Sequence, residues 1–314
     1  MVERRLTQNV KIFVPGSTGF VGKRVVAKLK ERGINYITAS QNSEVDFRDL
    51  EQTKRFFEQA KPDYVINCAA FVGGIKFGLE RQGEIFFNNI LMATNLMEAA
   101  RLSGVKRFVN PISNCAYPEH LTKFKEKDFW SGPLHDSVLA YGAVRKLSWV
   151  QGWAYQKQYG FDSVHLILPN MYGPGDYFEE VRSHALGALV MKFCEAKEKD
   201  APEVVVWGTG KPIREWLYVD DGAEALIRAL EIPSTIEPIN IGRGEGISIK
   251  ELAELIKKAV GYQGKIVFDA TKPDGALCKI MVVDKMKKIF NWSAPTTLED
   301  GIKKTIKDYY VQKR

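Results

Sequence analysis

The chain has 314 residues, of which 45% are hydrophobic and 26% are charged, a composition that is ordinary for a soluble globular protein. No apolar run approaches the roughly 20 residues that cross a bilayer, which excludes a membrane-spanning protein. The formal net charge of +7 would permit contact with nucleic acid, but the lysines are spread along the chain, so we expect a small anionic substrate and neither a nucleic-acid nor a membrane partner.

The cysteines and the N-terminal segment bear on the cellular compartment. Four cysteines, Cys68, Cys115, Cys194 and Cys278, lie far apart without CxxC spacing, so we predict no disulfide framework and no zinc or other metal site. The segment MVERRLTQNVKIF lacks the apolar core and cleavage site of a signal peptide. We therefore expect a cytoplasmic protein.

Between residues 9 and 113, short β-rich runs alternate with helical patterns: NVKIFVPG, VGKRVVAKLKERG, NYITAS, LEQTKRFFEQA and DYVINCAA. This alternation predicts right-handed βαβ units and a parallel sheet that is covered on both faces. A helix over about 83–103 leads to a fourth strand, KRFVNPIS. A long helix that begins near Val138 leads to the strand of DSVHLILPNMYGPGD.

From about Asp176 the pattern changes to helices with isolated short strands, EVVVWG, EPINIG and KIVFDA. We therefore predict an α/β protein, with a Rossmann-type doubly wound parallel sheet and a smaller mixed α/β C-terminal lobe for the substrate. The dinucleotide-binding domain is expected to span 1–175, with later strands returning near 216–243, and the second lobe to be formed mainly by 176–314.

A glycine-rich turn follows the first predicted strand. Gly16, Gly19 and Gly22 have GxxGxxG spacing, which suits a tight turn whose backbone approaches a diphosphate at a helix N-terminus. At the end of the second strand, Ser40 and Gln41 stand where an NAD-specific site commonly has an acid. The missing acid favours NADP, but no arginine stands there to receive a 2′-phosphate, so both cofactors stay open.

Six motifs occur in order: GSTGFVG, NCAA, SNCAYP, YGAVRK, PNMYGPGD and REWLYVDD. With them the chain resembles the extended short-chain dehydrogenase/reductases that act on nucleotide sugars. Within that group, AAFVGGI, the cysteine of SNCAYP, SHALGALVMKF, APEVVVWGTGKPIREWLYVDD and GYQGKIVFDATKPDG make it most similar to the GDP-L-fucose synthases. The resemblance runs from about residue 10 to the C-terminus. It implies an enzyme that binds NADP(H), epimerises GDP-4-keto-6-deoxymannose at C3 and C5, and reduces its C4 ketone.

The resemblance also assigns catalytic residues. Tyr141 matches the tyrosine that protonates the developing alkoxide, and Ser113 matches the serine that hydrogen-bonds the same oxygen. Cys115 and His184 match the pair that exchanges protons with carbon during epimerisation. A thiol and an imidazole have free pKa values of about 8.5 and 6.5, so both suit proton exchange near neutral pH.

The remaining implied contacts fall into two sets. Cofactor-binding positions are Gly16, Thr18, Gly19, Phe20, Val21, Gly22, Ser40, Ala69, Ala70, Tyr141, Arg145, Pro169 and Met171. Substrate-binding positions are Val72, Gly73, Gly74, Asn114, Asn170, Lys192, Trp207, Arg214 and Lys272, of which the cations are expected to hold the diphosphate. Asn89 also matches a family position near the substrate or the backbone.

One residue departs from the family pattern. Arg145 stands where the family has a lysine one helical turn after the tyrosine, and Lys146 lies about 100° further round the helix, so it should point elsewhere. Arginine keeps the charge but cannot pass a proton, so reduction would be affected more than epimerisation. Two alternatives stay open: an enzyme that only epimerises or only reduces a related nucleotide sugar, and a non-catalytic dinucleotide-binding regulator.

We also expect a homodimer. Family members commonly pair through two long helices, which here would be about residues 84–103 and 138–159.

Overall fold

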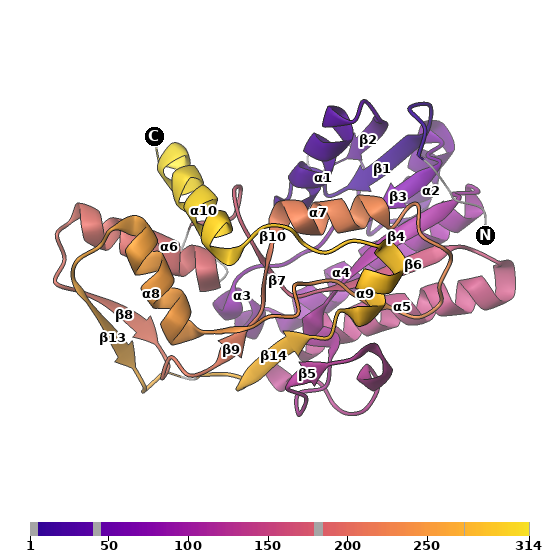
Figure 1. The fold of residues 1–314 in the computed structure, drawn as a ribbon. Helices are drawn as coiled ribbons and strands as arrows, with labels where there is room; N and C mark the ends of the chain where they lie inside the picture. The colour runs from indigo at the N-terminus through magenta and orange to yellow at the C-terminus, as the bar shows by residue number, and fades with distance from the viewer. Residues whose placement is uncertain (1–5, 40–44, 179–184, 273, 314) are drawn as a thin grey trace.

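The structure is a computed structural model that describes residues 6–39, 45–178, 185–272 and 274–313. Its centre is a six-stranded sheet in which all neighbouring strands are parallel, in the order β11–β6–β4–β3–β1–β2 (Figure 1). The strands are β1 (Lys11–Pro15), β2 (Asn35–Ala39), β3 (Tyr64–Ile66), β4 (Arg107–Ser113), β6 (Ser163–Leu168) and β11 (Ile239–Asn240). The predicted parallel sheet is confirmed.

The strand order creates a topological switch point. From β1 the chain passes to β2 on one side and then returns to β3 on the other side of β1. Loops that leave two such strands in opposite directions open a crevice at their carboxyl ends, where ligands of doubly wound folds bind. In this sheet the switch point lies between β1 and β3.

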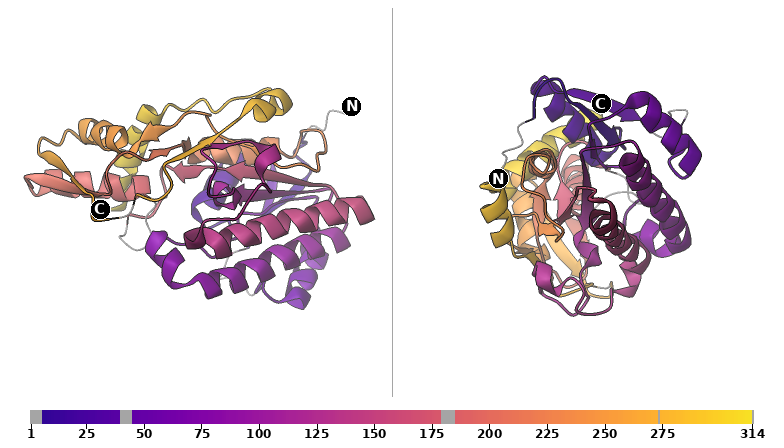
Figure 2. Two further views of the ribbon diagram at one scale, coloured as in Figure 1. Left: turned by 90° about the horizontal axis from the view of Figure 1, so that it is seen from below. Right: turned by 90° about the vertical axis from the view of Figure 1, so that its right-hand side faces the viewer.

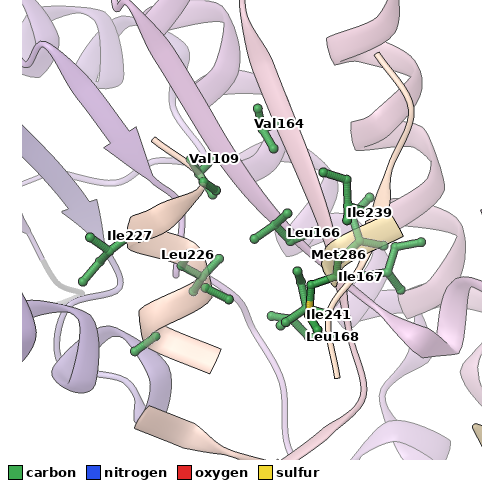
Figure 3. Close-up of a cluster of buried hydrophobic side chains, with 14 of the residues drawn as sticks. Val109, Val164, Leu166, Ile167, Leu168, Leu226, Ile227, Ile239, Ile241 and Met286 are labelled. Carbon is green, nitrogen blue, oxygen red and sulfur yellow. The ribbon is translucent and has the colours of Figure 1, made fainter. Parts of the chain in front are cut away.

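Helices cover both faces of the sheet. They are α1 (Phe20–Glu31), α7 (Val219–Arg228) and α9 (Asp284–Phe290) on one face, and α2 (Leu50–Ala60), α4 (Gln82–Leu102) and α5 (Leu139–Tyr159) on the other. In β1, Ile12 and Val14 join the core under α1 and α7, whereas Phe13 between them joins the core under α2 and α4. Figure 3 shows the first core, with Leu226 of α7 and Met286 of α9 facing the strands.

The helices α4 and α5 lie side by side on the outside of the molecule (Figure 2). The short helix α3 (Ile75–Glu80) precedes α4, and a 3₁₀ turn, η3 (Asp136–Val138), precedes α5. Within the described part of the chain, no helix is long and apolar enough to cross a membrane.

The second lobe has its own core. It contains α6 (Ala185–Glu198), α8 (Ile249–Val260), α10 (Leu298–Gln312), and the parallel pair β8 (Glu203–Trp207) and β13 (Lys265–Asp269). Buried side chains of all three helices meet there, among them Phe193, Ile256 and Ile302. Figure 1 shows this lobe to the left of the large sheet.

Short strands join the two lobes. A four-stranded sheet has the order β12–β9–β14–β5, and a second pair is formed by β10 and β7. Their bounds are β5 (Lys123–Phe124), β7 (Asn170–Tyr172), β9 (Ile213–Arg214), β10 (Trp216–Tyr218), β12 (Ile247–Ser248) and β14 (Cys278–Met281). Because β5 belongs to the loop that follows β4, and β9 enters from the second lobe, β14 connects the two regions.

Candidate active site

The glycine-rich turn lies at the switch point. Gly16 has φ +75°, and a Cβ at this position would come within 2.5 Å of the Cys68 carbonyl oxygen, so the β1 turn rests directly on the end of β3. A Cβ on Gly22 would overlap the carbonyl oxygen of Gly16. Gly19 is the N-cap of α1 and offers no side chain to cap it. These three positions leave the backbone bare where a diphosphate would meet a helix N-terminus, so the residues fit a dinucleotide.

The other predicted cofactor positions surround this turn. Thr18 is exposed within it, and Phe20 and Val21 begin α1. Ala69 follows β3, where its N–H donates to the Asn67 side chain at 3.2 Å, and Ala70 is next to it. Pro169 and Met171 lie where β6 passes into β7.

Asn89 of α4 holds the loop that follows Ala70. Its Oδ1 accepts from the Phe71 N–H at 2.8 Å, and its Nδ2 donates to the Phe71 carbonyl at 2.8 Å. The two bonds fix the start of the stretch Val72–Gly74, in which Val72 is 45% exposed. Because α3 contacts η3, this loop lies near the beginning of α5, which carries Tyr141.

The loop after β4 presents the serine and the cysteine. Ser113 ends β4 and caps the 3₁₀ turn η1 (Asn114–Ala116), since its Oγ accepts from the Cys115 N–H at 3.2 Å. Cys115 is partly buried and Asn114 is fully buried. A Cβ on Gly142 of α5 would lie 2.7 Å from the Cys115 carbonyl oxygen. Helix α5 therefore touches the loop that follows β4, residues 113–117, at the residue next to Tyr141.

Tyr141 and Arg145 form a pair on one face of α5. The Arg145 guanidinium donates to the Tyr141 hydroxyl at 3.1 Å and lies 4.8 Å from the centre of its ring. Arg145 is 5% exposed, and its Nε is among the buried polar atoms of the described residues that have no hydrogen-bond partner. A buried N–H without a partner is costly, so this face of Arg145 is suited to a ligand hydroxyl.

Lys146 points away from this pair, as the helix geometry predicted. Its Nζ donates to the Phe129 carbonyl at 2.6 Å and lies 4.5 Å from the centre of the Trp130 ring. Burial lowers the pKa of this ammonium. Lys146 therefore cannot take the place of the lysine that Arg145 replaces.

A second group of predicted residues gathers at one end of the second lobe. Trp207, at the end of β8, is 61% exposed, with Lys192 of α6 at 5.5 Å and Lys272 at 5.6 Å from its ring centre. Asp274 closes the loop that carries Lys272, because it accepts from the Thr209 N–H at 2.6 Å. An exposed aromatic plane flanked by two cations suits a base joined to a diphosphate.

Arg214 belongs to the same group. It lies on β9, and its guanidinium donates to the Asp274 carbonyl at 3.3 Å and to the Ile213 carbonyl at 2.9 Å. Burial lowers the pKa of Arg214, although a guanidinium stays charged in proteins. Asn170 of β7 is nearby, since its Nδ2 donates to the Glu215 carbonyl at 3.4 Å.

Two predicted site residues, His184 and Ser40, lie outside the described residues. The structure also reveals two polar residues that the sequence gave no reason to select, Glu215 and Asn240, both with no exposed surface. Burial raises the pKa of Glu215 to about 7, although three backbone N–H groups that donate to its carboxylate act in the opposite direction.

Residues 12–242 match the NAD dependent epimerase/dehydratase family. GDP-L-fucose synthase 1 of Arabidopsis thaliana is 38% identical over 307 residues, which cover 97% of this chain and 94% of the relative. A GDP-6-OMe-4-keto-L-xylo-heptose reductase from C. jejuni superimposes with a TM-score of 0.91 at 26% identity, covering 98% of this chain and 99% of that one.

An NADP-bound GDP-L-fucose synthetase from Naegleria fowleri superimposes with a TM-score of 0.89 at 30% identity, covering 99% of this chain and 96% of that one. Sequence and structure thus agree over nearly the whole length. The chain belongs to the NAD-dependent epimerase/dehydratase family of extended short-chain dehydrogenase/reductases.

Proposed function

We propose that this protein is a GDP-sugar epimerase and reductase, which inverts C3 and C5 of a GDP-4-keto-6-deoxyhexose and reduces its C4 ketone with NADPH. The observation that carries the proposal is the contact between α5 and residues 113–117, which we call the catalytic loop. At this contact Gly142 meets the Cys115 carbonyl, so the helix that carries the Tyr141–Arg145 pair packs against the loop of Ser113 and Cys115, which supports one shared site. The relatives named for GDP sugars support the substrate class.

For reduction, the chain contributes binding and a proton. NADPH would supply the hydride when bound, and the glycine turn with the N-terminus of α1 would hold its diphosphate. We assign to the Tyr141 hydroxyl the proton that the alkoxide at C4 takes up. The Ser113 Oγ accepts from the Cys115 N–H, which leaves its own hydroxyl proton to stabilise the same oxygen.

For epimerisation, one group removes a proton from the carbon beside the ketone, and another returns a proton on the opposite face. We assign the two roles to Cys115 and His184 by their family positions. Each carbon loses one proton and gains one, so this half of the reaction consumes no cofactor. The C4 ketone is required, because it stabilises the carbanion that deprotonation leaves.

The nucleotide is assigned to the second lobe. The Trp207 ring would stack on the base, while Lys192, Lys272 and Arg214 would face the diphosphate. Stacking does not by itself distinguish bases. The preference for GDP therefore rests on the relatives that are named for GDP sugars.

Because Arg145 replaces the family lysine, the second candidate is an enzyme that only reduces or only epimerises the sugar. The similarity to a GDP-heptose reductase favours the enzyme that only reduces. A fixed cation on the Tyr141 oxygen assists proton donation, but it cannot relay a proton as lysine can. A regulator that only binds a dinucleotide would have no need of Ser113, Cys115 and Tyr141 together, which counts against that alternative.

The assembly and the location remain predictions. A homodimer through α4 and α5 is supported by large apolar side chains that both helices expose, Phe86 and Phe87 on the first, Leu147 and Trp153 on the second. Burial of such side chains in a four-helix interface would remove them from water. The cytoplasmic location stays an expectation from the sequence.

One experiment tests the function. The protein is mixed with GDP-4-keto-6-deoxymannose in D₂O, with NADPH or NADH in separate samples. The proposal expects loss of NADPH absorbance together with deuterium at C3 and C5 of the product. Cofactor oxidation without deuterium incorporation would indicate an enzyme that only reduces. Deuterium incorporation without cofactor oxidation would indicate an enzyme that only epimerises. The absence of both signals would contradict the proposal.

A further inference from the structure

Glu215 is a buried carboxylate that joins three segments of the chain. It has no exposed surface, and its Oε1 accepts from the N–H groups of Arg243 at 2.7 Å and Gly244 at 2.9 Å. Its Oε2 accepts from the N–H of Met281 in β14 at 2.6 Å. A Cβ at Gly242 would collide with this carboxylate, so the loop after β11 fits closely around it.

Asn240 begins that same loop and reaches in the other direction. Its Nδ2 donates to the carbonyls of Phe124 at 2.8 Å and Val282 at 3.1 Å, and its Oδ1 accepts from the Tyr117 hydroxyl at 2.7 Å. The Tyr117 ring stacks on Phe124 with 4.5 Å between centres. Tyr117 stands two residues after Cys115, so Asn240 anchors the catalytic loop.

Glu215 is the second anchoring residue, and it stands next to Arg214 in the sequence. Glu215 directly follows β9 and precedes β10. Its carboxylate accepts from the N–H groups of the loop after β11 and of β14, whereas the neighbouring Arg214 guanidinium donates to the Asp274 carbonyl. Glu215 therefore fixes the chain at the end of β9, next to the residue that we assign to the diphosphate. Residues 240–244 therefore bind both the segment that carries Cys115, through Tyr117, and the segment that carries Arg214, through Glu215.

We propose that Tyr117, Asn240 and Glu215 form an inter-lobe clamp of positioning residues, which sets the distance between Cys115 and Arg214 to the span of one GDP-sugar. The proposal rests on the proposed function and adds a specificity device to it. The clamp touches neither reacting atoms nor ligand. It acts through the backbone that carries Cys115 at one end and Arg214 at the other.

A purely structural role would affect all ligands alike, so the test compares ligands. Glu215→Gln places an amide among three N–H donors and should shift β9, which raises the dissociation constant for GDP roughly tenfold. The dissociation constant for NADPH, whose site lies at β1 and α1, should stay within about twofold. Both constants are measured by titration calorimetry.

A second variant tests the other end. Tyr117→Phe removes one hydrogen bond, to Asn240, and keeps the ring stacked on Phe124. We expect the rate of deuterium incorporation to fall roughly tenfold, because small displacements of a reacting group are costly. The affinity for GDP should be unchanged. If Glu215→Gln does not fold, as judged by thermal unfolding and NADPH binding, Tyr117→Phe decides alone.

The control is Thr305→Val. Thr305 is also buried, lies on α10, and its hydroxyl donates to the Gly301 carbonyl at 2.8 Å, a bond that involves no residue of the clamp. It should lower stability without separating GDP from NADPH binding. The inference is overturned if Glu215→Gln weakens both ligands equally, or if neither clamp variant differs from the control. Failure of the unmodified protein to bind GDP would instead contradict the proposed function.

Discussion

His165 should make the stability of this protein sensitive to acid. It lies in β6 with 1% of its surface exposed, and burial lowers its pKa to about 3 from the usual 6.5. Its Nδ1 lies 3.1 Å from the Asn110 Nδ2, which can only donate, and its Nε2 lies 3.1 Å from the Ser163 Oγ. The folded protein therefore holds a neutral imidazole that is protonated on Nε2.

The sign and size of the effect follow from linkage. Because the pKa is lower in the folded state, the contribution is fully present above pH 6.5 and is lost as the pH falls toward 3. Each pH unit in this window corresponds to about 1.4 kcal/mol, so at pH 5 the loss is about 2 kcal/mol. The residue matters to the site, since Asn110 also donates to Ser148, whose hydroxyl donates to the Arg145 carbonyl at 2.8 Å.

The assay is urea unfolding of the unmodified protein and of His165→Gln at several pH values between 4 and 7. The variant loses some stability at pH 7. On acidification its free energy of unfolding should fall less steeply than that of the unmodified protein, and the two slopes should differ by about 1.4 kcal/mol per pH unit. His120→Gln replaces an exposed histidine and serves as the control for the loss of one imidazole. Parallel slopes for the protein and His165→Gln would refute the reasoning.

Three further predictions concern the site. Arg145→Met removes the donor to the Tyr141 hydroxyl and should lower the rate of NADPH oxidation about 100-fold, with deuterium exchange changed less than about threefold; equal losses would contradict the separation of the two half-reactions. Gly22→Ala should cost about 1–3 kcal/mol of stability and abolish NADPH binding in a fluorescence titration, because its methyl group meets the Gly16 carbonyl; normal binding would refute the proposed cradle. Trp207→Ala should weaken GDP binding by about 1–3 kcal/mol in calorimetry and leave NADPH binding intact. An unchanged affinity for GDP would contradict the proposal that the base stacks on Trp207.

The parallel sheet could be predicted because its signals are local. The pattern of LEQTKRFFEQA coincides with α2, and the buried run before the glycine turn coincides with β1. The four-stranded sheet could not be predicted, because β5 and β9 have two residues each. Such strands are too short to show a period, and they pair with β14 from distant parts of the chain.

The candidate site divides in the same way. The glycine turn and the direction of Lys146 away from Tyr141 follow from spacing and helix geometry. Glu215, Asn240 and His165 have no signature in a single sequence, since each is buried by segments far along the chain. A polar residue that lies among apolar neighbours in the sequence can equally well be exposed, and only the tertiary contacts distinguish the two cases.

The most direct test of the account is the deuterium content of the sugar after incubation of Cys115→Ser with GDP-4-keto-6-deoxymannose in D₂O. The account predicts that incorporation at C3 and C5 falls at least about 100-fold below the unmodified protein, while NADPH still binds with unchanged affinity. Incorporation at the original rate would contradict the placement of the thiol at the reacting carbons, and with it the epimerase half of the proposed function.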